Sequence, residues 1–288
     1  MYILYRYYKQ DTMQDTNLTD DQPIVLTTIE NRIATITLNR PHRRNALNGE
    51  LIEVLDEAVQ QVADNPDAKV VILTGAAGDG QHGGFCAGGD IKDGGQKNRD
   101  PNLPMGADAS KAADDPSKYD LHAPMLLHMM QKPTIAMVGG PAIGAGCSLA
   151  AACDLRYCSE NAVFASNFSA NGLSGDYGGS IFWTRLIGTS RTRELYYLND
   201  KIDARKALAW GMVNDVLPAA ELANHVRAIA ERLLRVSGPL LANIKDNLNQ
   251  AEQETDRRRY LFDLETRNQA SSVTEIRERM RRKAKTSS

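Results

Sequence analysis

The sequence lacks any uninterrupted apolar run of about 18 residues, the length that a membrane-spanning helix needs. Its four cysteines also lack the paired CxxC spacing of zinc sites and of many redox motifs. Three of the four stand in apolar or glycine-rich sequence, which is typical of reduced thiols in a reducing compartment. We therefore expect a cytoplasmic protein with no membrane partner and no metal site.

The chain has no excess of charge of one sign. Lys and Arg together number 34 against 36 for Asp and Glu, so the formal net charge is −2. A nucleic-acid-binding surface usually needs a basic excess, and so we expect no nucleic-acid partner. Residues 1–22 lack the continuous apolar stretch of a signal peptide, which predicts a disordered N-terminal extension.

What the sequence has is the pattern of a large α/β domain. Hydrophobic residues make up 42% of the 288 positions, enough for a sizeable core. Residues 24–29 and 33–38 read as a β-hairpin, 51–62 as an amphipathic helix capped by Asn48, and 69–75 as a buried strand. A strand over 133–139 then leads into a helix over 144–153. Repeated ββα units stacked side by side are the expected architecture.

The domain organisation follows from a change of pattern after Leu217. The sequence predicts a core over 23–217 and a helical region over 218–288, in which an apolar stripe precedes a helix that starts near Pro239. Residues 93–119 are rich in Asp, Gly, Pro and Lys, which predicts either a mobile flap or a tolerated surface insertion.

Two glycine-rich turns stand out, FCAGGDIK at 85–92 and VGGPAIGAGC at 138–147. Each follows a predicted strand, and the second precedes the helix-forming stretch SLAAA. Backbone N–H groups in the first turn of a helix have no partner within that helix, so they are free to bind an oxygen atom. Two such turns can aim their amides at one oxygen, which is the outline of an oxyanion hole.

The turns occur together with other motifs: ITLNRP at 36–41, RNAL at 44–47, VILTG at 71–75, CDL at 153–155, and the stretch 204–217. In this combination the chain resembles the crotonase superfamily, the enoyl-CoA hydratase and isomerase family, from Pro23 to its C-terminus. The resemblance implies a spiral of ββα units with a C-terminal helical trimerisation region, and a homotrimer or a dimer of trimers. It also implies an acyl-CoA substrate, with coenzyme A as part of the substrate and no permanently bound cofactor.

The resemblance further implies which residues form the site. Gly89 and Ala145 match the two backbone oxyanion donors, while glycine in both turns could instead serve tight packing alone. The residues expected at coenzyme A are Arg44, Ala46 and Leu47 for the pantetheine and phosphate portion, and Ala87, Asp90 and Ile91 for the adenine-side wall. The alternative for Arg44 is a plain surface charge.

The sequence departs from the family pattern where hydratases carry two glutamates, because Ser148 and Phe168 stand there. Neither is a strong general base, so a two-glutamate hydration mechanism is not expected. Asp176 matches an aspartate found in isomerase members and is our candidate acid/base, although an Asp at this position could also cap the helix that starts near Gly178. Tyr177 and Ser148 are secondary candidates, because each can donate a hydrogen bond, although both are poor bases at neutral pH.

These observations favour enoyl-CoA isomerisation with Asp176 as acid/base. The alternatives are an atypical enoyl-CoA hydratase without the two glutamates, a hydrolase that opens a ring in a cyclic diketone, and a non-catalytic CoA- or RNA-binding relative. The acidic composition and the absence of a basic stripe outside the C-terminus argue against RNA. His122 and His128 precede the second turn and are expected to be structural.

Overall fold

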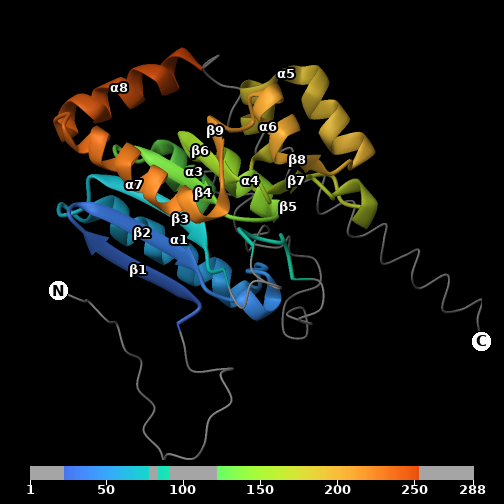
Figure 1. Cartoon of the computed structure of the whole chain (residues 1–288), viewed down its shortest axis with the longest axis horizontal. Helices are drawn as coiled ribbons and strands as arrows, with labels where there is room; N and C mark the ends of the chain where they lie inside the picture. The colour runs from blue at the N-terminus through green and yellow to red at the C-terminus, as the bar shows by residue number, and fades with distance from the viewer. Residues whose placement is uncertain (1–22, 78–83, 91–121, 253–288) are drawn as a thin grey trace, which may run out of the picture.

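The computed structural model describes residues 23–77, 84–90 and 122–252 (Figure 1). The predicted extension over 1–22 and the predicted flap over 93–119 lie outside these residues, as do Ile91 and positions 253–288 of the predicted helical region. The proposed division at 217 therefore stays a prediction.

A six-stranded sheet forms the centre of the described part, in the order β1-β2-β3-β4-β6-β9. The β1–β2 pair is antiparallel and the other pairs are parallel. Its strands are β1 (Val25–Glu30), β2 (Ile33–Leu38), β3 (Val70–Gly75), β4 (Thr134–Val138), β6 (Leu155–Ser159) and β9 (Asp215–Leu217). A smaller sheet has the order β5-β7-β8, formed by β5 (Ala142–Ile143), β7 (Val163–Ala165) and β8 (Ile202–Asp203).

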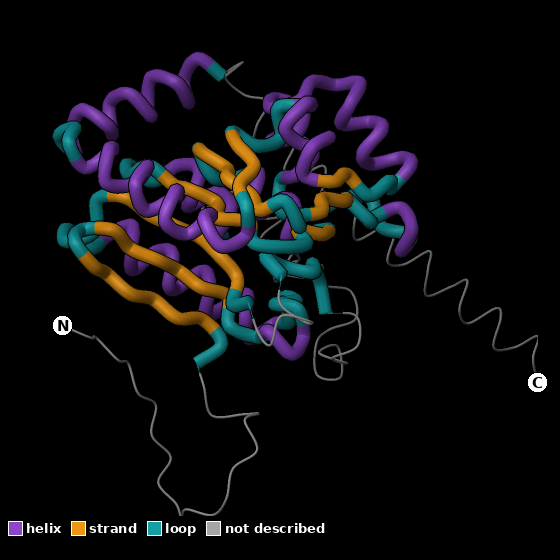
Figure 2. The backbone as a smooth tube through the Cα atoms, viewed as in Figure 1, coloured by secondary structure: helices purple, strands orange, loops and turns teal. Residues whose placement is uncertain are grey.

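Helices cover both faces of the large sheet (Figures 1 and 2). The helices of the described part are α1 (Gly49–Asp64), α3 (Ala123–Met129), α4 (Ala145–Ala151), α5 (Gly179–Leu198), α6 (Ala204–Trp210), α7 (Ala219–Leu234) and α8 (Gly238–Ala251), of which α5 lies beside the smaller sheet. Residues alternate along β3: Val71 and Leu73 join the core that contains α1 and α4, whereas Val70 and Ile72 pack under α7. Burial on both sides explains why β3 reads as a continuous apolar run.

The predicted N-terminal elements are confirmed. The hairpin pairs Val25 with Leu38 across β1 and β2. Helix α1 buries the predicted apolar stripe, and the Asn48 side chain accepts a hydrogen bond from the Leu51 N–H at 3.0 Å. That bond satisfies one of the amides that a helix start leaves without a partner, so local sequence alone set this boundary.

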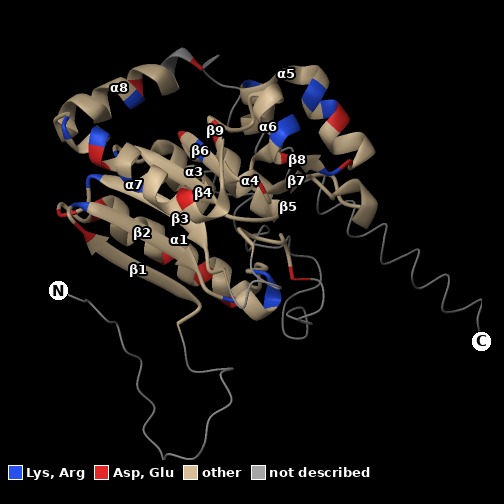
Figure 3. Cartoon of the chain, viewed as in Figure 1, with Lys and Arg blue, Asp and Glu red and all other residues tan. Residues whose placement is uncertain are grey.

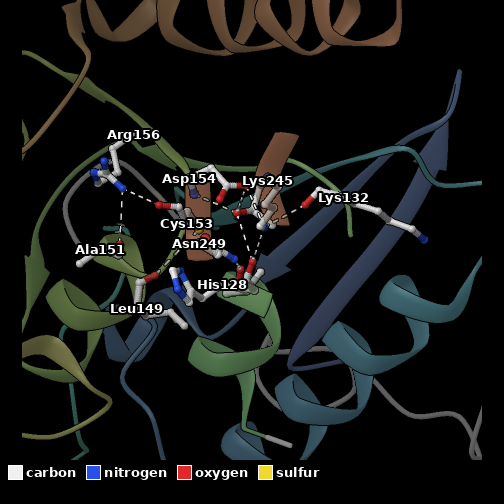
Figure 4. A network of polar contacts seen from close by, with 11 residues as sticks. His128, Lys132, Leu149, Ala151, Cys153, Asp154, Arg156, Lys245 and Asn249 are labelled. Atoms are coloured by element: carbon white, nitrogen blue, oxygen red, sulfur yellow. Dashed lines mark hydrogen bonds and ion pairs between the residues drawn. The ribbon is translucent and has the colours of Figure 1, made fainter. Parts of the chain in front are cut away.

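Helix α8 is held to the core by buried polar contacts (Figure 4). The Lys245 ammonium lies 2.9 Å from Asp154 Oδ2 and donates to the carbonyls of Leu127 and Lys132 at 2.8 and 3.0 Å. Asn249 Nδ2 donates to the His128 carbonyl at 2.9 Å. A buried ammonium is tolerated only when it is paired in this way, so these contacts specify where α8 docks.

A cavity of about 280 Å³ lies beside this network, between α8 and the core. Phe182, Leu233 and Leu241 contribute to its apolar lining, and Arg156 and Lys245 to its polar lining. None of its lining residues belongs to either glycine-rich turn. The cavity therefore lies where α8 docks on the core, apart from the two glycine-rich turns.

Charged residues of both signs are spread over the helices, while the strands contain few of them (Figure 3). In the described ranges, no helix is both long and apolar enough to cross a membrane. Nor do those ranges contain a group of three or more His, Cys, Asp or Glu residues that could hold a metal ion.

Candidate active site

The two glycine-rich turns lie against each other. Cys86 N–H donates to the Pro141 carbonyl at 3.1 Å, and Ile143 N–H donates to the Cys86 carbonyl at 2.9 Å. Gly88 has a φ of +83°, and a Cβ at this position would lie 2.7 Å from the Ile143 carbonyl oxygen. Only glycine fits this left-handed and crowded position. Gly88 therefore has the predicted packing role, and the two glycine-rich turns are in direct contact through their backbones.

The amide of Gly89 belongs to a parallel bridge with Leu47. Leu47 N–H donates to the Gly88 carbonyl at 2.8 Å, and Asp90 N–H donates to the Leu47 carbonyl at 2.9 Å. In this parallel bridge Leu47 uses both of its backbone groups, so the N–H of Gly89 points away from Leu47. The Ala145 nitrogen lies 3.5 Å from where a Gly88 Cβ would be, so the two candidate amides belong to adjoining segments.

The amide of Ala145 begins helix α4. Gly144 is the N-cap residue, with φ +56° and ψ −126°, and its own N–H donates to the Ala165 carbonyl at 2.9 Å. Neither the Ala145 N–H nor the Gly89 N–H donates a hydrogen bond to any residue in the described ranges. The adjoining turns therefore carry two amides with no acceptor among the described residues, and their role as oxyanion donors stays a prediction.

The start of α4 depends on a close approach at Gly146. A Cβ there would lie 2.3 Å from the Cys86 carbonyl oxygen and 2.6 Å from Cys86 Cβ, so the first turn and α4 touch through backbone. We expect Gly146→Ala to lower the free energy of unfolding by about 1–3 kcal/mol, the usual cost of overpacking. Urea unfolding measures this change.

Gly139 provides the matched control, because a Cβ at this position has nothing within 4 Å. We expect Gly139→Ala to leave the unfolding midpoint nearly unchanged. Equal midpoints for the two alanine variants would contradict a tight contact between Gly146 and Cys86.

The residues predicted at coenzyme A lie on the loops beside the first turn. Arg44 is exposed and ends a 3-10 helix (Pro41–Arg43), and its carbonyl accepts from Ala87 N–H at 3.0 Å. Ala46 and Leu47 are buried, while Ala87 is half-buried. The structure brings these segments together at the Gly88–Gly89 turn; their contacts with coenzyme A stay a prediction.

Two residues in this region were missed by the sequence analysis. Arg40 Nη2 lies 3.2 Å from Asp90 Oδ2 in a buried ion pair, so the Asp90 carboxylate faces the protein interior. The Asn45 side chain is fully buried, accepts from Arg40 N–H at 3.0 Å and donates to the Gly84 and Ala76 carbonyls at 2.6 and 3.1 Å. Arg40 and Asn45 stand within the family-like stretches NRP and RNAL, and these motifs were the sequence signal that could have identified them as functional residues.

Asp176 does not cap a helix, so the capping interpretation was wrong. Helix α5 begins at Gly179 with Gly178 as its N-cap and no side-chain capping bond. The half-buried Asp176 side chain instead accepts a hydrogen bond from the Tyr177 N–H at 2.7 Å, in a turn where Tyr177 has φ +58°. A carboxylate can take up and release a proton, and the acid/base role of Asp176 stays a prediction.

Contacts connect the Asp176 turn to α4. A Cβ at Gly179 would lie 2.1 Å from Ser148 Oγ and 2.5 Å from the Tyr196 hydroxyl oxygen, so α5 begins directly against α4. Ser148 is one helical turn beyond Ala145 and is buried. The turn that holds Asp176 therefore adjoins the helix that starts at Ala145, the second candidate oxyanion donor.

An aromatic wall stands where hydratases carry a glutamate. Phe168 is buried, its ring stacks on Tyr196 at 5.9 Å with an interplanar angle of 27°, and its Cε1 lies 3.9 Å from where a Gly144 Cβ would be. Phe168 and Ser148 thus flank the start of α4 without supplying a base, since a hydroxyl ionises too weakly at neutral pH.

The remaining candidates have other partners. His122 Nδ1 lies 2.8 Å from Asp56 Oδ2, and the His128 ring packs on Phe182 at 5.2 Å, in keeping with structural roles. Burial raises the pKa of the Cys86 and Cys147 thiols to about 12, so neither is a thiolate nucleophile near pH 7.

Comparison with known proteins identifies the family. The family model for enoyl-CoA hydratase/isomerase matches residues 28–286. The chain is 30% identical over 224 residues to a short-chain-enoyl-CoA hydratase from Clostridium acetobutylicum, covering 78% of this chain and 80% of that one. It is 33% identical over 233 residues to a 1,2-epoxyphenylacetyl-CoA isomerase from Escherichia coli, covering 80% and 84%.

A solved structure of an enoyl-CoA hydratase from Mycobacterium avium superposes with a TM-score of 0.71 at 26% identity, covering 88% of this chain and 100% of that one. The mixed sheet and its flanking helices therefore form a crotonase fold, as predicted. The chain belongs to the enoyl-CoA hydratase/isomerase family of the crotonase superfamily, whose members act on acyl-CoA thioesters.

Proposed function

We propose that the protein isomerises the double bond of an enoyl-CoA, with the N–H groups of Gly89 and Ala145 binding the thioester oxygen and Asp176 moving the proton. The observation that carries this proposal is that two adjoining turns each hold an amide with no acceptor among the described residues, while a third turn nearby holds a carboxylate. Donors preorganised for a developing oxyanion stabilise an enolate more than they stabilise the ground-state carbonyl.

The proposed reaction starts from a 3-enoyl-CoA. The Asp176 carboxylate removes a proton from C2, and the electrons of that C–H bond flow to the thioester oxygen, which becomes the oxyanion of a dienolate. The oxyanion accepts from Gly89 and Ala145. The same carboxyl then protonates C4, the carbonyl re-forms, and the double bond lies between C2 and C3. One group serves as base and acid, so no water is consumed.

Side chains around α4 support isomerisation over hydration. Addition of water needs a group that holds and deprotonates it, and Phe168 and Ser148 occupy the two positions where hydratases carry glutamates. Hydration by an atypical base is the second candidate, because relatives such as the Clostridium protein are named hydratases. Ring opening would also use the oxyanion donors, but it consumes water as hydration does.

The test is to supply a 3-enoyl-CoA and, separately, a 2-enoyl-CoA, in heavy water. Isomerisation predicts growth of the conjugated thioester absorbance from the 3-enoyl substrate with no gain of a water mass, and deuterium appears at C4 only where the Asp176 proton exchanges with solvent before its return. A 3-hydroxyacyl-CoA formed from the 2-enoyl substrate would instead establish hydration. Tight coenzyme A binding without turnover of either substrate would point to a non-catalytic relative.

Two further expectations belong to this proposal. Coenzyme A enters as part of the substrate, with no permanently bound cofactor. We also propose a homotrimer or a dimer of trimers, supported by the exposed apolar side chains of Leu240, Ile244 and Leu248 along α8. Apolar side chains in a row on a helix surface are typical of an interface between subunits.

A further inference from the structure

Arg40 connects two chain segments, one ending at Leu47 and one starting at Gly89, that pair in an isolated bridge. It follows β2, and its guanidinium is almost fully buried, with 8% of the side chain exposed. One terminal nitrogen, Nη2, lies 3.2 Å from Asp90 Oδ2, and the other, Nη1, donates to the Ala46 carbonyl at 2.6 Å. Ala46 immediately precedes Leu47, and Asp90 immediately follows Gly89.

These two contacts reinforce the backbone bridge that orients Gly89. The bridge consists of the bonds from Leu47 N–H to the Gly88 carbonyl and from Asp90 N–H to the Leu47 carbonyl. A rotation of the peptide between Gly88 and Gly89 would displace Asp90, and the ion pair with Arg40 opposes that displacement. We call the two Arg40 contacts, with Asp90 and with the Ala46 carbonyl, the clamp. The clamp therefore acts on the direction of the Gly89 N–H bond.

We propose that Arg40, through its ion pair with Asp90, is a positioning residue that holds the Gly89 N–H in line with the thioester oxygen. The inference rests on the proposed function, because it assigns the Gly89 amide to the oxyanion. Arg40 does not touch the substrate. Its buried charge is neutralised by Asp90, whose side chain is 5% exposed, so the guanidinium acts on the geometry of the turn.

The arrangement requires the forked shape of arginine. A planar guanidinium contacts the Asp90 carboxylate and the Ala46 carbonyl with two separate nitrogens. A lysine side chain is shorter and ends in a single nitrogen, so it cannot make both contacts with the same geometry. Arg40→Lys keeps the charge and loses the simultaneous contacts. Asp90→Asn keeps the shape and loses the ion pair, so the two variants perturb the clamp from opposite sides.

The test uses a saturated acyl-CoA with an isotope-labelled thioester carbonyl, which can neither isomerise nor hydrate. Its carbonyl stretching frequency, measured by infrared difference spectroscopy on the bound complex, falls when oxyanion donors polarise the carbonyl. We expect a clear fall with the wild type and a smaller fall with Arg40→Lys and with Asp90→Asn. In the isomerase assay the same variants should lose about 10- to 100-fold in kcat, with KM little changed. This loss is smaller than the loss expected on removing an oxyanion donor altogether, because the N–H group is still present but misdirected.

The matched control is Arg227→Lys, since Arg227 forms an exposed ion pair with Glu30 at 3.6 Å on α7. It should leave both frequency and kcat unchanged. Should Arg40→Lys fail to fold, Asp90→Asn carries the test alone. A full wild-type frequency shift in the clamp variants, whatever their thermal midpoint, overturns the positioning role. A wild type with no frequency shift at all removes the oxyanion role of Gly89 itself, and this inference with it.

Discussion

Asp176→Asn is expected to lower kcat for 3-enoyl-CoA isomerisation by about 100- to 10,000-fold, the range that a general acid/base contributes. The substitution is nearly isosteric, and the asparagine oxygen can still accept the hydrogen bond from the Tyr177 N–H, so the turn should keep its conformation. The amide cannot take a proton from C2 of the substrate. Steady-state kinetics, followed by the conjugated thioester absorbance, measures the effect.

Asp67→Asn is the matched control, because Asp67 is exposed in the connection between α1 and β3, outside the candidate site. It should retain wild-type kcat. Binding of a saturated acyl-CoA should be similar in both variants, since the lost step is proton transfer. If Asp176→Asn keeps full activity while Tyr177→Phe or His122→Ala abolishes it, Asp176 is not the base.

Ala145→Pro is expected to lower kcat by about 100- to 1000-fold, the usual effect of removing one oxyanion donor. Proline deletes a single N–H, and it is well tolerated at the first position of a helix, which Ala145 occupies in α4. Gly144, with φ +56° and ψ −126°, is not helical, so the residue before the new proline already avoids the α region that proline disfavours. Kinetics together with thermal melting measures the effect.

Ala219→Pro makes the equivalent change at the exposed first residue of α7 and should leave kcat unchanged. Ala145 itself is buried, so a replacement of its amide by a backbone ester provides a second variant that removes the N–H without adding a ring. Full kcat in either folded variant would show that the Ala145 amide does not bind the oxyanion.

Local elements were predictable because their signals lie in neighbouring residues. The alternation of apolar positions along β1 and β2, the stripe along α1 and the capping Asn48 each depend on spacings of a few residues. The Asp176 cap was predicted on the same kind of signal and was wrong. In the folded chain Tyr177 has a left-handed backbone conformation, and its N–H donates to the Asp176 carboxylate before α5 begins.

The sequence by itself determined the two glycine-rich turns, the strands and helices around them, and the family to which the chain belongs. Only the tertiary structure decided that the two glycine-rich turns pair through Cys86 and Ala142, that Arg40 forms an ion pair with Asp90, and that Lys245 reaches back to the Leu127 carbonyl across 118 positions. The physical reason is that propensities and caps act between near neighbours. The direction of an N–H bond and the pairing of buried charges depend instead on how distant segments pack together.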